Sequence, residues 1–561
     1  MQSRARARRL LENPTQRRLV AGAAARRALE RTLHVRNTSV TAASLRQTPL
    51  GRLRALGCVL IGTLLLMSTA FAGGRPSVFF DTDGYYLMGE NAAQGLKRLP
   101  AAFAGDHKAL TTPVSDDDQI DVTIMGARSP AYGLFLFVLE RLGGVWLVAG
   151  AQALICAWTV YLLWKVAAPA APLWTYLALT GGLAAGSTLP FFATFIMPDV
   201  FAGVAAALFV TLTVFGRRLS KAETAGTVLV LAFTYAVHAS HMITALAAMV
   251  PAVLAFWWFK APRGQVVRGY ALVLAAMVLA VVSGKAYEGA FAMRTGMTLH
   301  RPPFLMARVL ADGPGRAYVR QVCRGPDRPY VICRAMRAPL TRSDDILWEE
   351  SPLIGAFNAL KSPELQLRME AEEWSFVKAA VLNDPWGQFK ASMENWADQL
   401  TRISVHDPLR DPRQFLANEY WKTTRLVDMI PHPEDCKPIG AGCKPPFDVG
   451  LTKHWHELVM ALSALFAVWR LSRPDVRADL CDRKAPWARA AVPMAVAVLI
   501  LAGMVVLNAG VCGIISGAFS RYQARIVWLW PASAGLIAIR LGLALPQGLR
   551  ARLRGRQAQA V

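Results

Sequence analysis

The sequence lacks the features of an ATP-using or nucleotide-binding enzyme. It contains no phosphate-binding glycine loop, no internal repeat and no soluble nucleotide-binding domain. None of its eight cysteines is spaced as CxxC, which argues against a zinc module. Acidic residues are scarce, because 38 Asp and Glu stand against 62 Lys and Arg, for a net charge of +24. The chain therefore shows no means of using ATP.

What the sequence has in excess is apolar residues. Hydrophobic residues make up 54% of the 561, which is too many for a soluble protein of this length. Several apolar runs approach the roughly 20 residues that a helix needs to cross a bilayer. Backbone groups in lipid must bond to one another, and the runs lack strand alternation. We therefore predict an all-α polytopic membrane protein with about ten transmembrane helices, near 55–73, 145–166, 173–189, 199–216, 224–238, 241–259, 269–286, 456–471, 489–508 and 524–543.

The orientation follows from the basic connections between these spans. With ten spans, every arginine- and lysine-rich connection falls on one side: the first fifty residues, 217–221, 260–268, 470–489 and 550–556. This predicts a multi-pass protein of the bacterial inner membrane with both termini cytoplasmic. Topology and attraction to anionic phospholipid account for the positive charge. No nucleic-acid partner is needed, although the basic arm leaves one as the weaker alternative.

The same threading predicts two long periplasmic segments. The first, 74–144, contains an apolar stretch from Tyr132 to Leu142 that is too short to span and suits an interfacial helix. The second, 287–455, predicts a mostly helical periplasmic subdomain, with one helix over 364–382 that follows Ser362-Pro363. The predicted parts are a basic disordered arm (1–54), helices 1–7 (55–286), the subdomain (287–455), helices 8–10 (456–545) and a basic tail (546–561).

Two processing features belong to the periplasmic side. Ala70-Phe71-Ala72 resembles a signal-peptidase site, but the long basic region before it favours a retained first helix. Four cysteines lie in the second segment, and an oxidising compartment predicts the disulfides Cys323–Cys333 and Cys436–Cys443. Other pairings of the four, and a zinc site, are the alternatives.

Few polar residues interrupt the apolar part, and the threading brings them together at the outer face. Asp81 and Asp83 follow the first span, where a carboxylate can take a proton or bind a divalent cation. A solvated turn is the plain alternative. Asp199 opens the fourth span as either a helix cap or a cavity-facing acid.

Histidines and arginines join these acids. His238 and His241 share a helix face and suit metal binding, phosphate binding or acid–base work, unless they only mark a polar break. Arg521 and Arg525 form an outward basic face, against the positive-inside trend, which suits an anionic lipid headgroup or simple snorkelling. Arg128 has the same two interpretations, a phosphate contact or a headgroup anchor.

Four short motifs resemble the GT-C superfamily of integral membrane glycosyltransferases, which includes protein mannosyltransferases and aminoarabinose lipid A transferases. Phe79-Phe80-Asp81-Thr82-Asp83-Gly84-Tyr85-Tyr86 lies where that family has its catalytic acid. The run 128–133 is similar to the R/H-x-P-x-Y element, except that Gly133 follows where the family usually has a second proline or Tyr-Pro. Pro198-Asp199 and Ser520-Arg521-Tyr522 are similar to a second acid and to an Arg-Tyr that opens a late span.

The resemblance implies a donor sugar on a polyprenyl phosphate or diphosphate, transferred to a periplasmic or lipid acceptor. Asp81 or Asp83 would be the catalytic base, with a divalent cation there as an open alternative. Substrate contacts would come from Arg128, Tyr132, Asp199, His238, His241, Arg521, Tyr522 and Arg525. Other functions stay open: an O-antigen polymerase or ligase type of enzyme using His406-Asp407, a flippase or transporter, or a non-catalytic envelope assembly factor.

Overall fold

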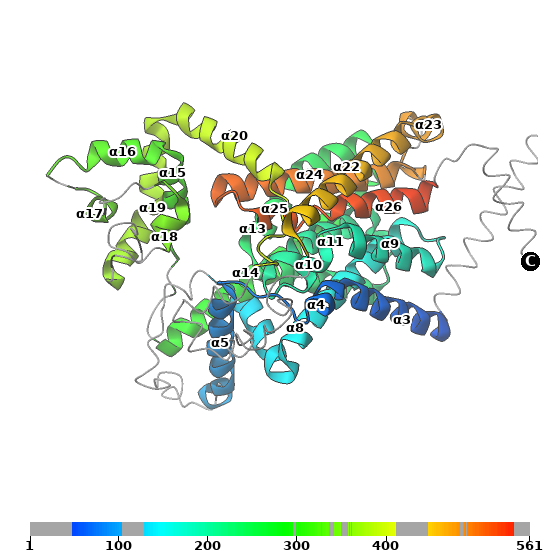
Figure 1. The fold of residues 1–561 in the computed structure, drawn as a ribbon, viewed down its shortest axis with the longest axis horizontal. Helices are drawn as coiled ribbons and strands as arrows, with labels where there is room; N and C mark the ends of the chain where they lie inside the picture. The colour runs from blue at the N-terminus through cyan, green and yellow to red at the C-terminus, as the bar shows by residue number, and fades with distance from the viewer. Residues whose placement is uncertain are drawn as a thin grey trace, which may run out of the picture.

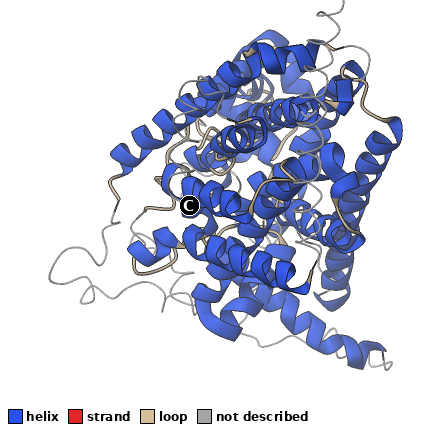
Figure 2. Ribbon diagram, turned by 90° about the vertical axis from the view of Figure 1, so that its right-hand side faces the viewer, coloured by secondary structure: helices blue, strands red, loops and turns tan. Residues whose placement is uncertain are grey.

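The computed structural model describes residues 48–103, 128–295, 299, 301–326, 328–335, 341–348, 357, 360, 362–410, 447–482, 486–489 and 491–542. Within these residues the chain is helical, and Figure 2 shows no strand. One isolated bridge joins Ser77 to Phe195. Most of the predicted basic arm, the basic tail and the predicted disulfide Cys436–Cys443 lie outside the described residues.

Among the described residues, seven helices are long and apolar enough to cross a membrane, which agrees with an all-α membrane protein. Each overlaps one predicted span, and they cover Pro49–Leu66, Pro130–Ala167, Pro198–Arg218, Ala239–Trp258, Arg263–Ala292, Ala491–Ile515 and Ser520–Leu541. The other three predicted spans fall in α9 (Leu173–Gly186), α12 (Lys221–Val237) and α22 (Val449–Ser472). The first two have only 14 and 17 residues, and α22 carries several charged residues. Length and composition alone therefore support seven spans of the expected ten.

Local sequence signals fix where the helices begin and break. Ser129 and Ser220 accept bonds at the starts of α8 (Pro130–Ala167) and α12, and Glu223 completes a capping box. His238 is the one extended residue between α12 and α13 (Ala239–Trp258). The remaining bundle helices are α3 (Pro49–Leu66), α4 (Ser68–Ala72), α10 (Leu189–Ala193), η1 (Pro198–Val200), α11 (Phe201–Phe215), η2 (Gly216–Arg218), α14 (Arg263–Thr295), α23 (Pro474–Cys481), η7 (Pro486–Ala488), α24 (Ala491–Ile515), α25 (Ser520–Ala524) and α26 (Leu529–Leu541).

The described residues of the segment 74–144, the predicted first outer segment, include a pair of crossing helices. In Figure 1, α5 (Thr82–Phe103) runs across the direction shared by α3, α22 and α26. The predicted short helix over 132–142 is the first part of α8, which breaks at Gly143 and Gly144, the latter with φ +67°. The helices cross at two glycines, where a Cβ on Gly133 would lie 2.6 Å from the Tyr85 carbonyl oxygen.

The second outer segment has its own apolar core. It comprises α15 (Phe304–Asp312), α16 (Pro314–Val322), α17 (Ile332–Ala335), α18 (Ser343–Leu347), α19 (Pro363–Asn383) and α20 (Pro385–Thr401). Met306, Leu310, Phe357 and Phe376 are among the residues buried there. The predicted helix over 364–382 is confirmed as α19, capped by Ser362 with Pro363 in the first turn. The predicted disulfide Cys323–Cys333 is present, so the zinc alternative is wrong for this pair.

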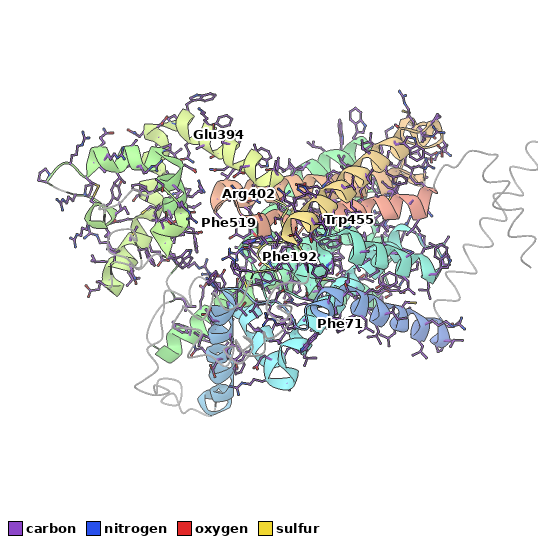
Figure 3. The ribbon with its side chains drawn as sticks, in the orientation of Figure 1. Phe71, Phe192, Glu394, Arg402, Trp455 and Phe519 are labelled. Carbon is purple, nitrogen blue, oxygen red and sulfur yellow. A yellow bond between two sulfur atoms is a disulfide. The ribbon has the colours of Figure 1, made fainter. Side chains whose placement is uncertain are left out.

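Helix α20 joins this subdomain to the bundle, as the positions of Glu394 and Arg402 in Figure 3 show. Gln399 bonds the Phe519 backbone at both its carbonyl oxygen and its N–H, each at 2.9 Å. Trp396 Nε1 donates to the Val506 carbonyl oxygen at 3.0 Å. These polar contacts fix the end of α20 beside α25, next to Arg521.

We expect Gly89→Ala and Gly133→Ala to destabilise the protein by about 1–3 kcal/mol each. In both, the new methyl group meets backbone atoms of the facing helix, which have no rotamer through which to move away. Thermal unfolding in detergent measures the effect. Gly182→Ala in α9 is the control, because nothing lies within 4 Å of its Cβ. Midpoints equal to that of the control would contradict the close crossing.

Candidate functional site

Asp81 is the centre of the candidate site and is held by two guanidinium groups from distant parts of the chain. Arg128 Nη2 donates to Asp81 Oδ1 at 2.6 Å. Both terminal nitrogens of Arg521 lie 3.4 Å from Asp81 Oδ2, on the other side of the carboxylate. The first contact is short and the second is long. Arg521 is therefore the more loosely held arginine.

A backbone clamp fixes the loop that carries Asp81. Ser77 N–H donates to the Thr194 carbonyl oxygen at 3.1 Å, and Ile196 N–H donates to the Ser77 carbonyl oxygen at 2.8 Å. The Thr82 hydroxyl donates to the Ile196 carbonyl oxygen at 3.1 Å and accepts from Phe79 N–H at 2.9 Å. The chain from 194 to 197 leads directly into Pro198 and Asp199. The clamp therefore sets Asp81 and Asp199 relative to each other.

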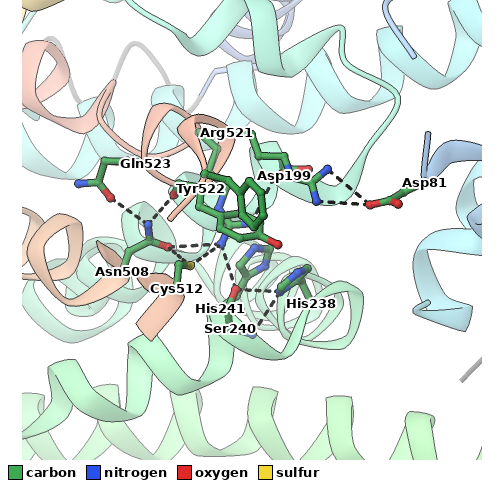
Figure 4. A network of polar contacts seen from close by, with 12 residues as sticks. Asp81, Asp199, His238, Ser240, His241, Asn508, Cys512, Arg521, Tyr522 and Gln523 are labelled. Atoms are coloured by element: carbon green, nitrogen blue, oxygen red, sulfur yellow. Dashed lines mark hydrogen bonds and ion pairs between the residues drawn. The ribbon is translucent and has the colours of Figure 1, made fainter. Parts of the chain in front are cut away.

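Asp199 and Arg525 form a second, deeper pair. Arg525 Nη1 donates to Asp199 Oδ1 at 3.2 Å, and its other terminal nitrogen donates to Ser240 Oγ at 3.0 Å. The same nitrogen lies 3.4 Å from Asn508 Oδ1 and 3.3 Å from Cys512 Sγ. Figure 4 labels Asp199 and Ser240 among the residues of this network. Asp199 is 3% exposed and makes no side-chain capping bond at the start of η1 or α11. Its carboxylate therefore serves the ion pair rather than a helix cap.

The two histidines join this network by different routes. His238 Nδ1 accepts from the Ser240 backbone N–H at 3.2 Å and lies 2.7 Å from Ser240 Oγ. His241 Nδ1 lies 2.8 Å from the Thr234 carbonyl oxygen, so this nitrogen carries the proton. The His241 Nε2 is then an acceptor, and it is buried with no partner among the described residues. The imidazole rings stack at 5.2 Å.

The two acids of the first loop have opposite ionisation behaviour. Burial alone would raise the pKa of Asp81, but the Arg128 and Arg521 guanidinium groups outweigh it and hold the pKa below its ordinary value. Burial raises the pKa of Asp83 to about 7, and repulsion from Asp81 adds to this effect. The Gly84 N–H, which donates to Asp83 Oδ1 at 2.6 Å, opposes the rise. Near neutral pH, Asp83 is thus the acid that can exchange a proton.

The two tyrosines of the predicted site have supporting positions. Tyr132 is fully buried, and its hydroxyl donates to Gln152 Oε1 at 2.8 Å. Gln152 Nε2 in turn donates to the Phe195 carbonyl oxygen at 2.8 Å, so Tyr132 stiffens the clamp behind Asp81. The Tyr522 ring lies 5.2 Å from the Cζ of Arg521 and 5.0 Å from that of Arg525. Tyr522 thus lies between the Asp81–Arg521 ion pair and the Asp199–Arg525 ion pair.

Several residues at the site were not predicted. Gln152 and Asn508 are amides inside apolar spans, which is a signal that the sequence did contain. Ser240 and Cys512 carried no such signal, since small polar residues are common in membrane helices. Asp344 and Asp407 come from the segment 287–455 and interact electrostatically with Arg521. The sequence had named Asp407 only for the polymerase or ligase alternative. Only the fold brings these last two acids to the site.

Two features of the predicted site concern metal binding and a cleft among the described residues. Among the described residues, no group of three or more His, Cys, Asp and Glu side chains is arranged to hold a metal ion. Both Asp81 oxygens face arginines, so a cation there would compete with them. A cleft of about 360 Å³ opens between Leu400, Ile403, Met460 and Trp530, and none of the site residues lines it. The predicted residues converge as a packed network.

Compared with known proteins, the chain matches no family model, no curated protein and no solved structure.

We expect Arg525→Leu to lower the free energy of unfolding by about 3–5 kcal/mol, because it leaves the Asp199 carboxylate buried without its partner. The double variant Asp199→Asn/Arg525→Leu should recover part of this loss. Denaturant unfolding in detergent gives both values. As a control, Arg402→Ala removes an exposed ion pair to Asp398 and should cost less than about 1 kcal/mol. Equal losses for the single and double variants would contradict the ion pair as the cause.

Proposed function

We propose that this chain is a membrane glycosyltransferase that moves a sugar from a polyprenyl-phosphate-linked donor to a periplasmic or lipid acceptor. The proposal includes ten spans, with both termini in the cytoplasm of a bacterial cell and the Asp81 loop on the periplasmic side. It rests first on the GT-C-like motifs, whose residues the sequence places far apart. Asp81 and Arg521 are 440 residues apart in the sequence, yet their side chains form a hydrogen bond.

The observation that carries the proposal is that the Asp81 carboxylate pairs with two arginines at unequal distances, 2.6 Å for Arg128 and 3.4 Å for Arg521. An anionic phosphate can replace Asp81 at Arg521, because that contact is 3.4 Å long. Arg521 also stacks 4.4 Å from the Phe79 ring, which keeps its planar group in place while its N–H donors change partner. Arg128 would stay on Asp81 and add positive charge beside the departing phosphate.

Asp83 is the better candidate for the catalytic base. A base works best when its pKa is near the working pH, and the pKa of Asp83 is about 7. In the proposed step, the acceptor hydroxyl or amine loses its proton to Asp83 and attacks the anomeric carbon with inversion. The bond from that carbon to the phosphate oxygen breaks, and the polyprenyl phosphate leaves with the electron pair. The activated donor supplies the driving force, so no ATP site is required.

One observation favours the polymerase or ligase type as a second candidate. Asp407 comes from the large outer segment and is close enough to Arg521 to interact with it electrostatically. Its neighbour Arg410 pairs with it at 3.6 Å. In this alternative, Asp407 rather than Asp83 accepts the proton. Comparing Asp407→Asn with Asp83→Asn separates the two candidates.

We expect Asp83→Asn to lower sugar transfer by about 10²–10⁴-fold, because the base is lost. In the unmodified protein, kcat/KM should rise with pH to a plateau above about 7, where Asp83 is ionised. Stability has the opposite dependence. Between pH 3.8 and about 7 the folded protein keeps the Asp83 proton, whereas the unfolded chain has lost it. The free energy of unfolding therefore falls as pH rises through this range.

Asp81→Asn should also lower transfer, because Arg128 and Arg521 lose the carboxylate that holds them. It also removes a negative neighbour of Asp83, so the remaining activity should rise at a lower pH than in the unmodified protein. Asp398→Asn on the exposed face of α20 is the control and should keep full activity. Full activity in Asp81→Asn, Asp83→Asn and their double variant would refute the proposed base.

We expect Arg521→Ala to weaken the binding of an isoprenyl phosphate by about tenfold or more, since a charged phosphate loses a guanidinium partner. Titration calorimetry with purified protein and farnesyl phosphate measures the affinity. Arg473→Ala is a matched control, because Arg473 also stacks on an aromatic ring, that of Trp469, away from the site. An unchanged affinity in Arg521→Ala would remove Arg521 from the donor site.

A further inference from the structure

Among the described residues, the outer subdomain places one aromatic side chain, Trp348 after α18, against Arg128. Its ring lies 5.4 Å from the Cζ of Arg128. The Tyr85 ring of α5 lies 5.7 Å from the same carbon. Arg128 also donates the 2.6 Å bond to Asp81. One guanidinium group therefore contacts an aromatic ring of the bundle, an aromatic ring of the outer subdomain and the central acid.

Contacts within the outer subdomain also hold Trp348. Its backbone N–H donates to the Asp344 carbonyl oxygen at 2.8 Å, and its ring packs 6.0 Å from that of Phe304 in α15. The preceding residues Ile346 and Leu347 are buried in the outer core. The Ile346 carbonyl oxygen accepts from Phe357 N–H at 3.0 Å. The indole that faces Arg128 is thus also held by its own subdomain.

The consequence for Arg128 is a reduced choice of rotamers. An arginine side chain loses much conformational freedom when it is held in one geometry, and aromatic faces on the guanidinium provide part of the compensation. A planar guanidinium that is already oriented loses less freedom when it binds an anion. Without Trp348, only Tyr85 and Asp81 would hold Arg128 among the contacts described here.

We propose that Trp348 is a positioning residue that holds Arg128 at Asp81, so that the outer subdomain sets the affinity of the site for an anionic headgroup. The link to a headgroup rests on the function proposed above. The positioning itself rests on the contacts of Trp348, Arg128 and Tyr85.

The test compares purified full-length protein with Trp348→Ala, Arg128→Gln and the double variant. Two measurements are made, the affinity for farnesyl phosphate and the thermal unfolding midpoint. We expect Trp348→Ala to weaken binding about three- to tenfold. The double variant should bind no more weakly than Arg128→Gln, because Trp348 acts through Arg128. Trp348→Phe should keep most of the affinity, because a phenyl ring also presents a face to the guanidinium.

Trp374→Ala is the control, because Trp374 lies in the same subdomain on α19 and is 69% exposed. It should change neither measurement. Additive losses in the double variant, or a Trp348→Phe affinity as low as that of Trp348→Ala, would overturn the inference. If Trp348→Ala does not fold, Trp348→Leu replaces it, since leucine keeps apolar bulk without a ring.

The two proposals fail separately. If the unmodified protein does not bind farnesyl phosphate, the proposed donor site is wrong, and the unfolding midpoints decide the positioning role. Non-additive midpoint changes for Trp348 and Arg128 would then support it, and additive changes would overturn it. If farnesyl phosphate binds and only Arg521→Ala weakens it, the donor site stands and Trp348 has no part in it.

Discussion

The packing of the helices around the candidate site depends on one carboxylate, that of Asp81, which pairs with arginines from two distant segments of the chain. Asp81 lies in the loop before α5, Arg128 lies just before α8, and Arg521 begins the last apolar helix. Bringing two arginines and an acid out of water is costly unless each charge finds a partner. The positions of α5, α8 and α25 are therefore coupled, because a shift of any one would leave a charge without its partner. The site and the packing of its helices form a single structural unit.

The deeper pair of Asp199 and Arg525 differs from this one in its surroundings. Arg525 is fully buried, and its terminal nitrogens contact a carboxylate, a hydroxyl, an amide oxygen and a thiol. A guanidinium group with so many partners has little freedom to bind a ligand. The structure therefore distinguishes Arg521 from Arg525, to which the sequence analysis gave the same role. Arg525 holds Asp199 in place. Arg521 has a long contact to Asp81 and is the arginine that can exchange this carboxylate for a ligand.

The sequence predicted the class of fold and much of the site, because both depend on chemistry that is visible along the chain. Apolar length predicted the seven long helices, and the Ser362-Pro363 signal predicted the start of α19. Polar residues at one predicted depth did meet in one network. The sequence did not single out Trp348, and it named Asp407 only for the polymerase or ligase alternative, because these two residues reach Arg128 and Arg521 only through tertiary packing. The short spans were also ambiguous, since α9 and α12 fall below the length at which composition alone is decisive.

Gly133 shows how a departure from a motif can have a physical reason. The GT-C element that residues 128–133 resemble usually has a second proline or Tyr-Pro, whereas here α5 crosses α8 at Gly133. A side chain on Gly133 would meet the carbonyl oxygen of Tyr85 at 2.6 Å. The Tyr85 ring in turn faces Arg128 and packs edge-to-face with Tyr132. The glycine therefore lets α5 approach closely enough for Tyr85 to hold Arg128, and Arg128 to hold Asp81. A residue that looks like a lost feature in the motif is a requirement of the helix crossing on which the acid site is built.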